Sequence, residues 1–154
     1  MDQKTFNDMV GDGTYHFFVF SCPAIIPFNM ALHTRIVIVH PNGEIVRREL
    51  GYFKDKKNPS RGYIHKNFLP PRKGIPKYFW KTTSYFPSTL LYHSCGDIKS
   101  STYTIVSSME TYIQKYPYKQ HYRLVWHNSN YFTQWILSCF PEITCSLPRN
   151  AVGK

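Results

Sequence analysis

A serine between two asparagines is the first feature of this sequence that could do chemistry; it lies in the stretch HNSNYF, residues 127–132. Asn128 is a good N-cap, so we expect Ser129 to be the first residue of a helix. The unpaired backbone N–H groups and the dipole at a helix start would stabilise an alkoxide or a developing oxyanion. A cysteine there would gain directly from a lowered pKa, whereas a serine needs a base within hydrogen-bond reach.

His33, at the start of a predicted strand, is the candidate base for Ser129. His127, beside the serine, is a rival, although successive residues at a strand-to-helix turn usually point apart. Each of these residues also has a structural interpretation, because serine commonly caps helices and histidines at strand starts commonly serve as hydrogen-bond partners. Asn128 and Asn130 either cap the helix or help to build an oxyanion site.

Cysteine spacing gives no support for a zinc ribbon or a thioredoxin motif, because no C-x-x-C pair occurs. We therefore expect reduced thiols. His93 and Cys95 flank one residue and could ligate a metal, but no second pair with ligand spacing accompanies them, and structural zinc sites need four ligands. The sequence predicts no metal site and no cofactor.

A β-hairpin is expected to hold His33. The β-branched runs HTRIVIVH (33–40) and IVRREL (45–50) flank PNGE, in which Asn-Gly supplies the positive φ values of a tight turn. The earlier run TYHFFVFSCP (14–23) is rich in aromatic and β-branched residues and stops at proline, which is typical of a buried strand.

Helical spacing of apolar residues follows in two segments. Residues 101–117 show it up to Pro117, and the segment from Asn128 shows it up to Pro141. Between them, residues 121–127 predict a short strand. The fold class is therefore α+β, with an antiparallel sheet packed against helices. The apolar residues are Ile105, Met109, Tyr112, Ile113 and Tyr116 in the first segment, and Phe132, Trp135, Ile136 and Cys139 in the second.

Residues 54–81 carry much of the net charge of +10, which results from 19 Lys+Arg against 9 Asp+Glu. Their prolines predict a long loop or an irregular flap. Cations among aromatics predict docking on an anionic surface, either a membrane or nucleic acid. The alternative is a solvated loop whose lysines maintain solubility. The cations are Lys54, Lys56, Lys57, Arg61, Lys66, Arg72, Lys73, Lys77 and Lys81.

The whole chain, residues 1–154, is expected to fold as a single domain, because 154 residues with 42% hydrophobic content can bury a core. The start of the sequence has no signal-peptide pattern, and no run approaches the roughly 18 apolar residues of a membrane span. We expect a cytoplasmic protein, or an effector exported without a signal peptide. The sequence predicts no oligomeric state.

Two short motifs resemble those of the PPPDE deubiquitinase-like peptidases. HTRIVI (33–38) is similar to their H-T-x-I-V-V, and NSNYF (128–132) to their N-C-N-x-F, with serine in place of the nucleophilic cysteine. The resemblance implies a circularly permuted papain-like fold, shared with lecithin:retinol acyltransferase-like proteins. In that fold the strand that begins with the catalytic histidine precedes the helix that begins with the nucleophile, so His33 would be the imidazole and Ser129 would occupy the nucleophile position.

A closer resemblance, covering most of the chain, is to the mainly bacterial domain-of-unknown-function family 3750. It rests on YPYKQHYRLVWHNSNYFTQWI (116–136) and on the proline-containing end LPRNAVGK (147–154), and it is weak through residues 54–100. This resemblance implies a bacterial protein in which serine is the usual residue at position 129. It implies no activity.

Two functions are therefore expected. The first is an acyl-transfer hydrolase that cleaves an amide, ester or thioester bond of a peptide, protein or acyl-lipid substrate with Ser129 and His33. Glu44, Glu49 and His65 are candidates to orient His33, and no spacing decides among them. The alternative is a catalytically inactive binding module for a protein, peptide or lipid partner, because a neutral serine gains little from helix position alone.

Overall fold

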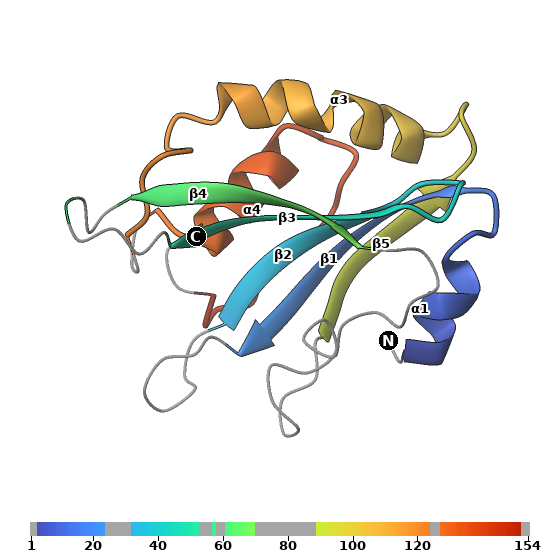
Figure 1. The fold of residues 1–154 in the computed structure, drawn as a ribbon, viewed down its shortest axis with the longest axis horizontal. Helices are drawn as coiled ribbons and strands as arrows, with labels where there is room; N and C mark the ends of the chain where they lie inside the picture. The colour runs from blue at the N-terminus through green and yellow to red at the C-terminus, as the bar shows by residue number, and fades with distance from the viewer. Residues whose placement is uncertain are drawn as a thin grey trace.

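A computed structural model describes residues 3–23, 32–52, 57, 61–69, 89–123 and 127–151. Over these residues the chain is an α+β protein with a five-stranded antiparallel sheet and three helices (Figure 1). None of the described helices is long and apolar enough to cross a membrane.

The sheet has the strand order β4-β3-β2-β1-β5. Its strands are β1 (Tyr15–Pro23), β2 (Leu32–Val39), β3 (Ile45–Tyr52), β4 (Gly62–Leu69) and β5 (Thr89–Gly96). The strand predicted at 14–23 and the hairpin predicted at 33–50 are confirmed as β1, β2 and β3. At the predicted turn the Gly43 N–H donates to the His40 carbonyl at 2.8 Å, so Pro41 and Asn42 are the central residues of the turn and Gly43, with φ 83°, follows them.

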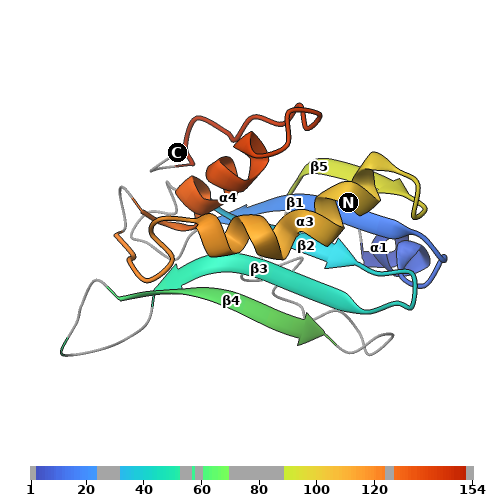
Figure 2. The same cartoon turned by 90° about the horizontal axis from the view of Figure 1, so that it is seen from above.

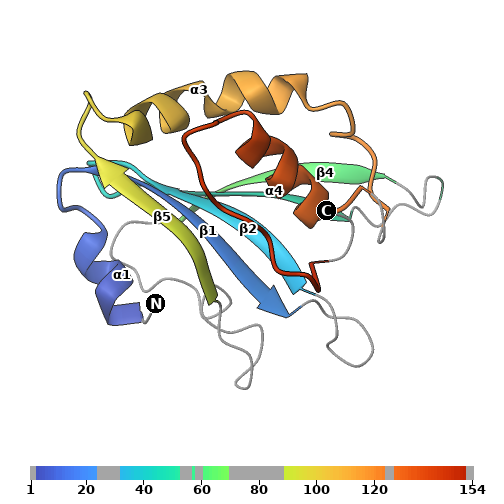
Figure 3. The ribbon, with the colours of Figure 1, turned by 180° about the vertical axis from the view of Figure 1, so that it is seen from behind.

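Helices cover both faces of the sheet. They are α1 (Gln3–Met9), α3 (Ser101–Lys115) and α4 (Ser129–Ser138), and the last two confirm the helices predicted from apolar spacing. Figures 1 and 3 show α3 and α4 on one face and α1 on the other. Seen from above in Figure 2, α3 and α4 lie side by side over the strands.

Because β1 lies between β2 and β5 and is covered on both faces, it contributes alternate side chains to two apolar cores. Phe17 and Val19 belong to the larger core under α3 and α4. Phe18 and Phe20 belong to the smaller core, where Phe6 of α1 packs against Phe18 with ring centroids 5.1 Å apart. This arrangement explains why β1 is a nearly continuous apolar run rather than an alternating one.

The prediction that residues 54–81 lack regular structure is wrong for Gly62–Leu69, which form β4, the edge strand. Eight register pairs join β4 to β3, from Tyr52↔Gly62 to Ile45↔Leu69. The error came from the prolines, since Pro59 and Pro70 flank the strand and do not interrupt it. Residues 53–56, 58–60 and 70–88 lie outside the described part of the chain.

The short strand predicted at 121–127 is wrong for the residues that the structure describes there, 121–123 and 127, and residues 124–126 lie outside the described part of the chain. Arg123 and His127 form an isolated bridge with each other, in which the Arg123 N–H donates to the His127 carbonyl at 2.9 Å. Because these two residues pair with each other, they do not belong to one continuous strand. His121 makes a further isolated bridge, to Arg61.

Candidate active site

The candidate site lies where β2 and β3 separate. Their register pairs run only from Ile36↔Arg48 to Val39↔Ile45, although β2 begins at Leu32 and β3 continues to Tyr52. Beyond the pair Ile36↔Arg48, Glu49 is the next residue of β3, and His33 lies three residues before Ile36 on β2. Helix α4 packs against both strands, which brings its first residue, Ser129, to this end of the sheet.

Three side chains from these elements form a hydrogen-bonded chain. Ser129 Oγ lies 2.6 Å from His33 Nδ1, and His33 Nε2 lies 2.6 Å from Glu49 Oε2. The predicted proximity of Ser129 and His33, 96 positions apart, is thus found. Because a carboxylate only accepts hydrogen bonds, the ring proton belongs on Nε2, and Nδ1 is left to accept the proton of the serine hydroxyl.

Of the three candidates to orient His33, Glu49 is the one in contact with it. Glu44 instead lies beside His40, with Nε2 to Oε1 3.9 Å. The side chain of His65 lies outside the described residues. Successive side chains of a strand point to opposite faces of the sheet. Arg48 and Leu50 of β3 therefore lie on one face, and Glu49 lies on the other face together with Arg47.

Two arginines hold Glu49 as a carboxylate. Arg35 Nε lies 3.4 Å from Oε2, and Arg47 Nε lies 3.2 Å from Oε1, with the Glu49 side chain only 10% exposed. Burial acting alone would raise the pKa of Glu49, but the hydrogen bond and charge of His33 and the charges of the two arginines lower it to about 2. Glu49 is therefore ionised at any pH at which the protein would work. Its charge and, more strongly, burial raise the pKa of the nearby Tyr122 hydroxyl.

Both asparagines beside Ser129 have structural contacts. The side chain of Asn128 accepts hydrogen bonds from the backbone N–H groups of Asn130 and Tyr131, so Asn128 is the N-cap. The amide of Asn130 donates to the Leu32 carbonyl at 2.7 Å and accepts from Thr34 Oγ1 at 3.0 Å. Asn130 therefore fixes α4 against the start of β2. Both asparagines thus have the structural contacts of the helix-cap alternative, and the backbone N–H of Ser129 is a further candidate donor to an oxyanion.

Access to the site is asymmetric. Ser129 is 2% exposed, whereas 23% of the His33 side chain is exposed. A ligand would therefore reach the serine hydroxyl from the imidazole side.

The rival base His127 is engaged elsewhere. Its ring stacks on Tyr118 with centroids 3.7 Å apart and meets Tyr131 edge-on. Burial, followed by the charges of Arg123 and His121, lowers the pKa of His127. This histidine belongs to an aromatic cluster with Tyr118 and Tyr131.

The cations predicted to bind an anionic surface are only partly described. Lys57, Arg61 and Lys66 are exposed, and Lys66 Nζ lies 3.6 Å from Glu110 Oε1. Surface docking remains a prediction. The other six, which lie outside the described residues, are Lys54, Lys56, Arg72, Lys73, Lys77 and Lys81.

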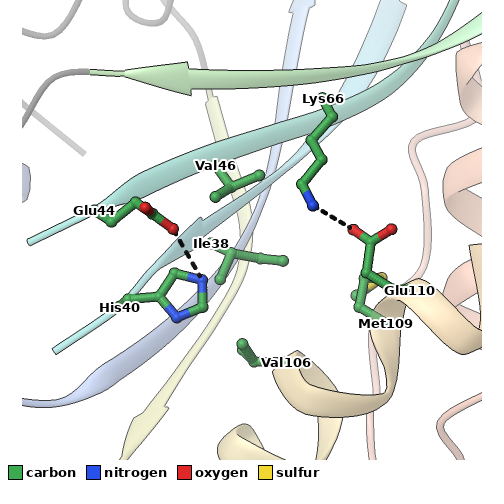
Figure 4. A pocket seen from close by; sticks show the side chains of 8 residues that line it. All are labelled: Ile38, His40, Glu44, Val46, Lys66, Val106, Met109 and Glu110. Carbon is green, nitrogen blue, oxygen red and sulfur yellow. Dashed lines mark ion pairs between the residues drawn. The ribbon is translucent and has the colours of Figure 1, made fainter. Parts of the chain in front are cut away.

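One pocket lies away from the serine, between the hairpin, β4 and α3 (Figure 4). Its polar side chains lie in two pairs, His40 with Glu44 and Lys66 with Glu110. The lining residues are Ile38, His40, Glu44, Val46, Lys66, Val106, Met109 and Glu110.

Sequence reasoning missed Arg35, Arg47 and Thr34 as parts of the site. The sequence did hold a signal for the two arginines. Arg47 is two residues from Glu49 in a predicted strand, so the two side chains share one face. Arg35 is likewise two residues from His33 on β2. Thr34 gave no such signal, because its role depends on how α4 docks.

The family profile described as "Protein of unknown function (DUF3750)" matches residues 29–154. The matched part includes the strands and the helix that carry Ser129, His33 and Glu49. No curated protein and no solved structure matches the chain.

Proposed function

The chain belongs to the DUF3750 family, and from the geometry of its site we propose that it is an acyl-transfer hydrolase with Ser129 as nucleophile, His33 as general base and Glu49 as the carboxylate that orients His33. The observation that carries the proposal is the pair of 2.6 Å contacts that joins the three side chains in that order. Nucleophile, base and orienting group in hydrogen-bond sequence are the arrangement that activates a serine.

In the first half of the reaction, Ser129 Oγ attacks the carbonyl carbon of the substrate while His33 Nδ1 takes its proton. Glu49 stabilises the imidazolium that forms, without taking the proton itself. The Ser129 N–H and the dipole of α4 stabilise the oxyanion. The imidazolium then gives its proton to the leaving group, and the carbonyl re-forms as an ester of Ser129.

In the second half, His33 removes a proton from a water molecule, which attacks the acyl-serine. Collapse of this second tetrahedral intermediate releases the acid, and His33 returns the proton to Ser129 Oγ. The sum is hydrolysis of one acyl bond. Amides, esters and thioesters of peptides, proteins or acyl lipids all fit this scheme.

We also propose that the domain is a circularly permuted papain-like fold. The order of the elements supports this assignment, because the histidine strand β2 comes early and the helix α4, which begins with the nucleophile, comes late. The antiparallel sheet between them is consistent with it.

A serine-directed fluorophosphonate tests the activity. We expect it to label Ser129, identified by peptide mapping, and His33→Ala to slow labelling by roughly 10³-fold, since general-base catalysis contributes about 10² to 10⁴. His127→Ala is the matched control and should label at the wild-type rate. Absence of labelling in folded wild-type protein at high probe concentration would refute the proposal.

The burial of Ser129 favours a second candidate, a catalytically inactive domain that keeps the polar chain for structure and binds a peptide, protein or lipid partner. Ser129→Cys separates the two. A site poised for catalysis should make this thiol react with iodoacetamide at pH 7 about 10- to 30-fold faster than in Ser129→Cys/His33→Ala, because an unperturbed cysteine is only a few per cent thiolate there. Cys95 is exposed, so both variants also carry Cys95→Ser.

A further inference from the structure

A second cluster of reactive side chains lies at the opposite end of β1, on the face covered by α1. His16 of β1 pairs in register with Cys95 of β5, and Phe18 pairs with His93. Since alternate residues of a strand share a face, His16, His93 and Cys95 all project on the side of Phe18 and its partner Phe6. Figure 3 shows the two strands side by side, with α1 next to them.

The ligand atoms of this cluster converge. His16 Nδ1 lies 3.0 Å from His93 Nε2, and one ring nitrogen of each histidine and Cys95 Sγ all lie within 4.8 Å of one another. Two imidazoles and a thiol are the ligand types that Zn²⁺ and related metals take. All three side chains come from adjacent antiparallel strands, so their backbones are held in place without the metal.

The far side of the His16 ring is fixed by a carboxylate. Asp12 Oδ2 lies 3.0 Å from His16 Nε2, and Thr14 Oγ1 lies 2.9 Å from the same nitrogen and 2.7 Å from Asp12 Oδ1. The proton of His16 therefore belongs on Nε2, and the Nδ1 lone pair points at the cluster. A carboxylate behind a histidine is the usual second layer of a metal site, where it sets the tautomer and strengthens the ligand.

The local sequence explains how Asp12 reaches His16. Gly11 and Gly13 on either side of it have φ 82° and 87°, a region that favours glycine, and they turn the chain back from α1 onto β1. On the other side of the cluster, Phe18 stacks on His93 with centroids 4.3 Å apart and planes 7° apart, which fixes that ring. Both imidazoles are therefore preorganised.

We propose that His16, His93 and Cys95 form a binding site for a divalent transition metal, with Zn²⁺ as the best-fitting ion and Asp12 as the positioning carboxylate. Three protein ligands leave the fourth tetrahedral position to water or to an external ligand, on the exposed side where Cys95 lies. On binding, the Cys95 thiol loses its proton to solvent, and the proton shared by the two imidazoles moves to His93 Nδ1. One proton is released for each ion bound.

The fit needs only a small adjustment. Tetrahedral Zn²⁺ with usual bond lengths separates two nitrogens by roughly 3.3 Å and a nitrogen from sulfur by roughly 3.6 Å. The observed nitrogen pair is close to that value, and the sulfur must approach by about an ångström at most, a rotation available to an exposed side chain.

The metal would not take part in chemistry at Ser129. His33 pairs with Cys22 on β1, and Val39 pairs with His16, so the two sites are six residues apart along β2, roughly 20 Å at the rise of a strand. A metal here would instead tie the edge strand β5 to β1 and to the turn after α1. The spacing of these residues in the sequence did not predict the site, because His16 lies next to His93 and Cys95 only through the pairing of β1 with β5.

Titration of the full-length reduced chain with Co²⁺ tests the site. We expect a 1:1 complex with tetrahedral ligand-field bands and a thiolate-to-cobalt charge-transfer band, and Zn²⁺ should displace the cobalt. Cys95→Ser should remove the charge-transfer band and weaken binding by more than about 100-fold, beyond the 10- to 100-fold expected for loss of a second-layer group. Because Cys95 is exposed, this variant should keep the wild-type circular dichroism spectrum and melting temperature.

Cys139→Ser, which removes a thiol elsewhere in the chain, is the matched control and should keep the band and the affinity. Asp12→Asn should keep the band and weaken binding by about 10- to 100-fold. The proposal is overturned if the wild-type chain binds no cobalt in a 1:1 complex, or if the charge-transfer band survives in Cys95→Ser. In the first case the two imidazoles only share a proton.

Discussion

His33 and His16 have hydrogen-bond partners in the same arrangement, but the two sites are suited to different chemistry. Each ring has a carboxylate on Nε2, Glu49 for one and Asp12 for the other, and each directs Nδ1 at a second group. For His33 that group is the Ser129 hydroxyl, and for His16 it is the His93 ring. A lone pair aimed at an O–H is placed to take a proton, whereas lone pairs and a thiol that converge are placed to hold a cation.

The two carboxylates, Glu49 and Asp12, also differ in how far they are buried and in which groups surround them. Glu49 is 10% exposed and lies between two arginines, while Asp12 is 35% exposed and is supported by Thr14. For both groups burial acts to raise the pKa and is outweighed; hydrogen bonds and nearby positive charge lower it. The lesson is that a carboxylate-histidine pair does not define a function: the group on the other ring nitrogen does.

We expect the largest difference between the two histidine sites in the rate at which Ser129 is acylated. Glu49→Gln should slow labelling of Ser129 by a fluorophosphonate roughly 10²- to 10⁴-fold, because an amide no longer fixes the Nε2–H tautomer or stabilises the imidazolium. Glu44→Gln, which changes the other hairpin glutamate, is the control and should label normally. Equal rates for the two variants would show that Glu49 is only a structural ion-pair partner.

The next largest difference between Glu49 and Asp12 should be in how much each contributes to the stability of the fold at low pH. The pKa of Glu49 in the folded protein is about 2, below its usual value of 4.5, so the unfolded state binds more protons between those values. Its contribution to the free energy of unfolding, on the order of 3 kcal/mol, is complete above pH 4.5 and is lost as the pH falls toward 2.

Urea unfolding at pH 4.5 and pH 2.5 measures this loss. Glu49→Gln should show a shallower fall in the free energy of unfolding than the wild-type chain, and Asp12→Asn should differ from wild type by less, since Asp12 is more exposed. If Asp12→Asn flattened the fall more than Glu49→Gln, the contrast drawn between the two carboxylates would be wrong.

The smallest expected effects concern how α4 is held. Asn130→Ala removes two buried hydrogen bonds to β2 and should lower the free energy of unfolding by about 2 kcal/mol. Asn128→Ala removes the N-cap and should lower it by about 1 kcal/mol. Only Asn130→Ala should also slow Ser129 labelling markedly, because Asn130 sets the distance between α4 and His33. The same loss of labelling in Asn128→Ala would remove this distinction.

The sequence predicted those parts of the fold that local patterns determine. The Asn-Gly turn of the hairpin, the apolar spacing of α3 and α4, and the proline that follows each of these helices are all local signals. Strand β4 was missed because its flanking prolines suggested a loop, and β5 and α1 were not predicted. Their places depend on pairing with β1 and on packing against Phe18, which are long-range contacts.

The candidate site shows the same division. Ser129, His33 and the cap Asn128 could be chosen from residue type and spacing, and the chosen pair does meet. The choice of Glu49 over Glu44 could not be made, because it depends on β2 and β3 being unpaired before Ile36 and after Arg48. That His16 lies beside Cys95 could not be predicted either, because the register between two strands cannot be determined from the sequence of one of them alone.

The central claim is that His33 Nδ1 is the proton acceptor for Ser129, and the tautomer of the His33 ring tests it most directly. Long-range ¹H–¹⁵N correlation spectra of the wild-type chain at pH 8, with His33 assigned by comparison with His33→Ala, identify which nitrogen carries the proton. We expect a proton on Nε2 and an unprotonated, hydrogen-bonded Nδ1. A ring protonated on Nδ1 would contradict it, because that nitrogen could not then accept the proton of the serine.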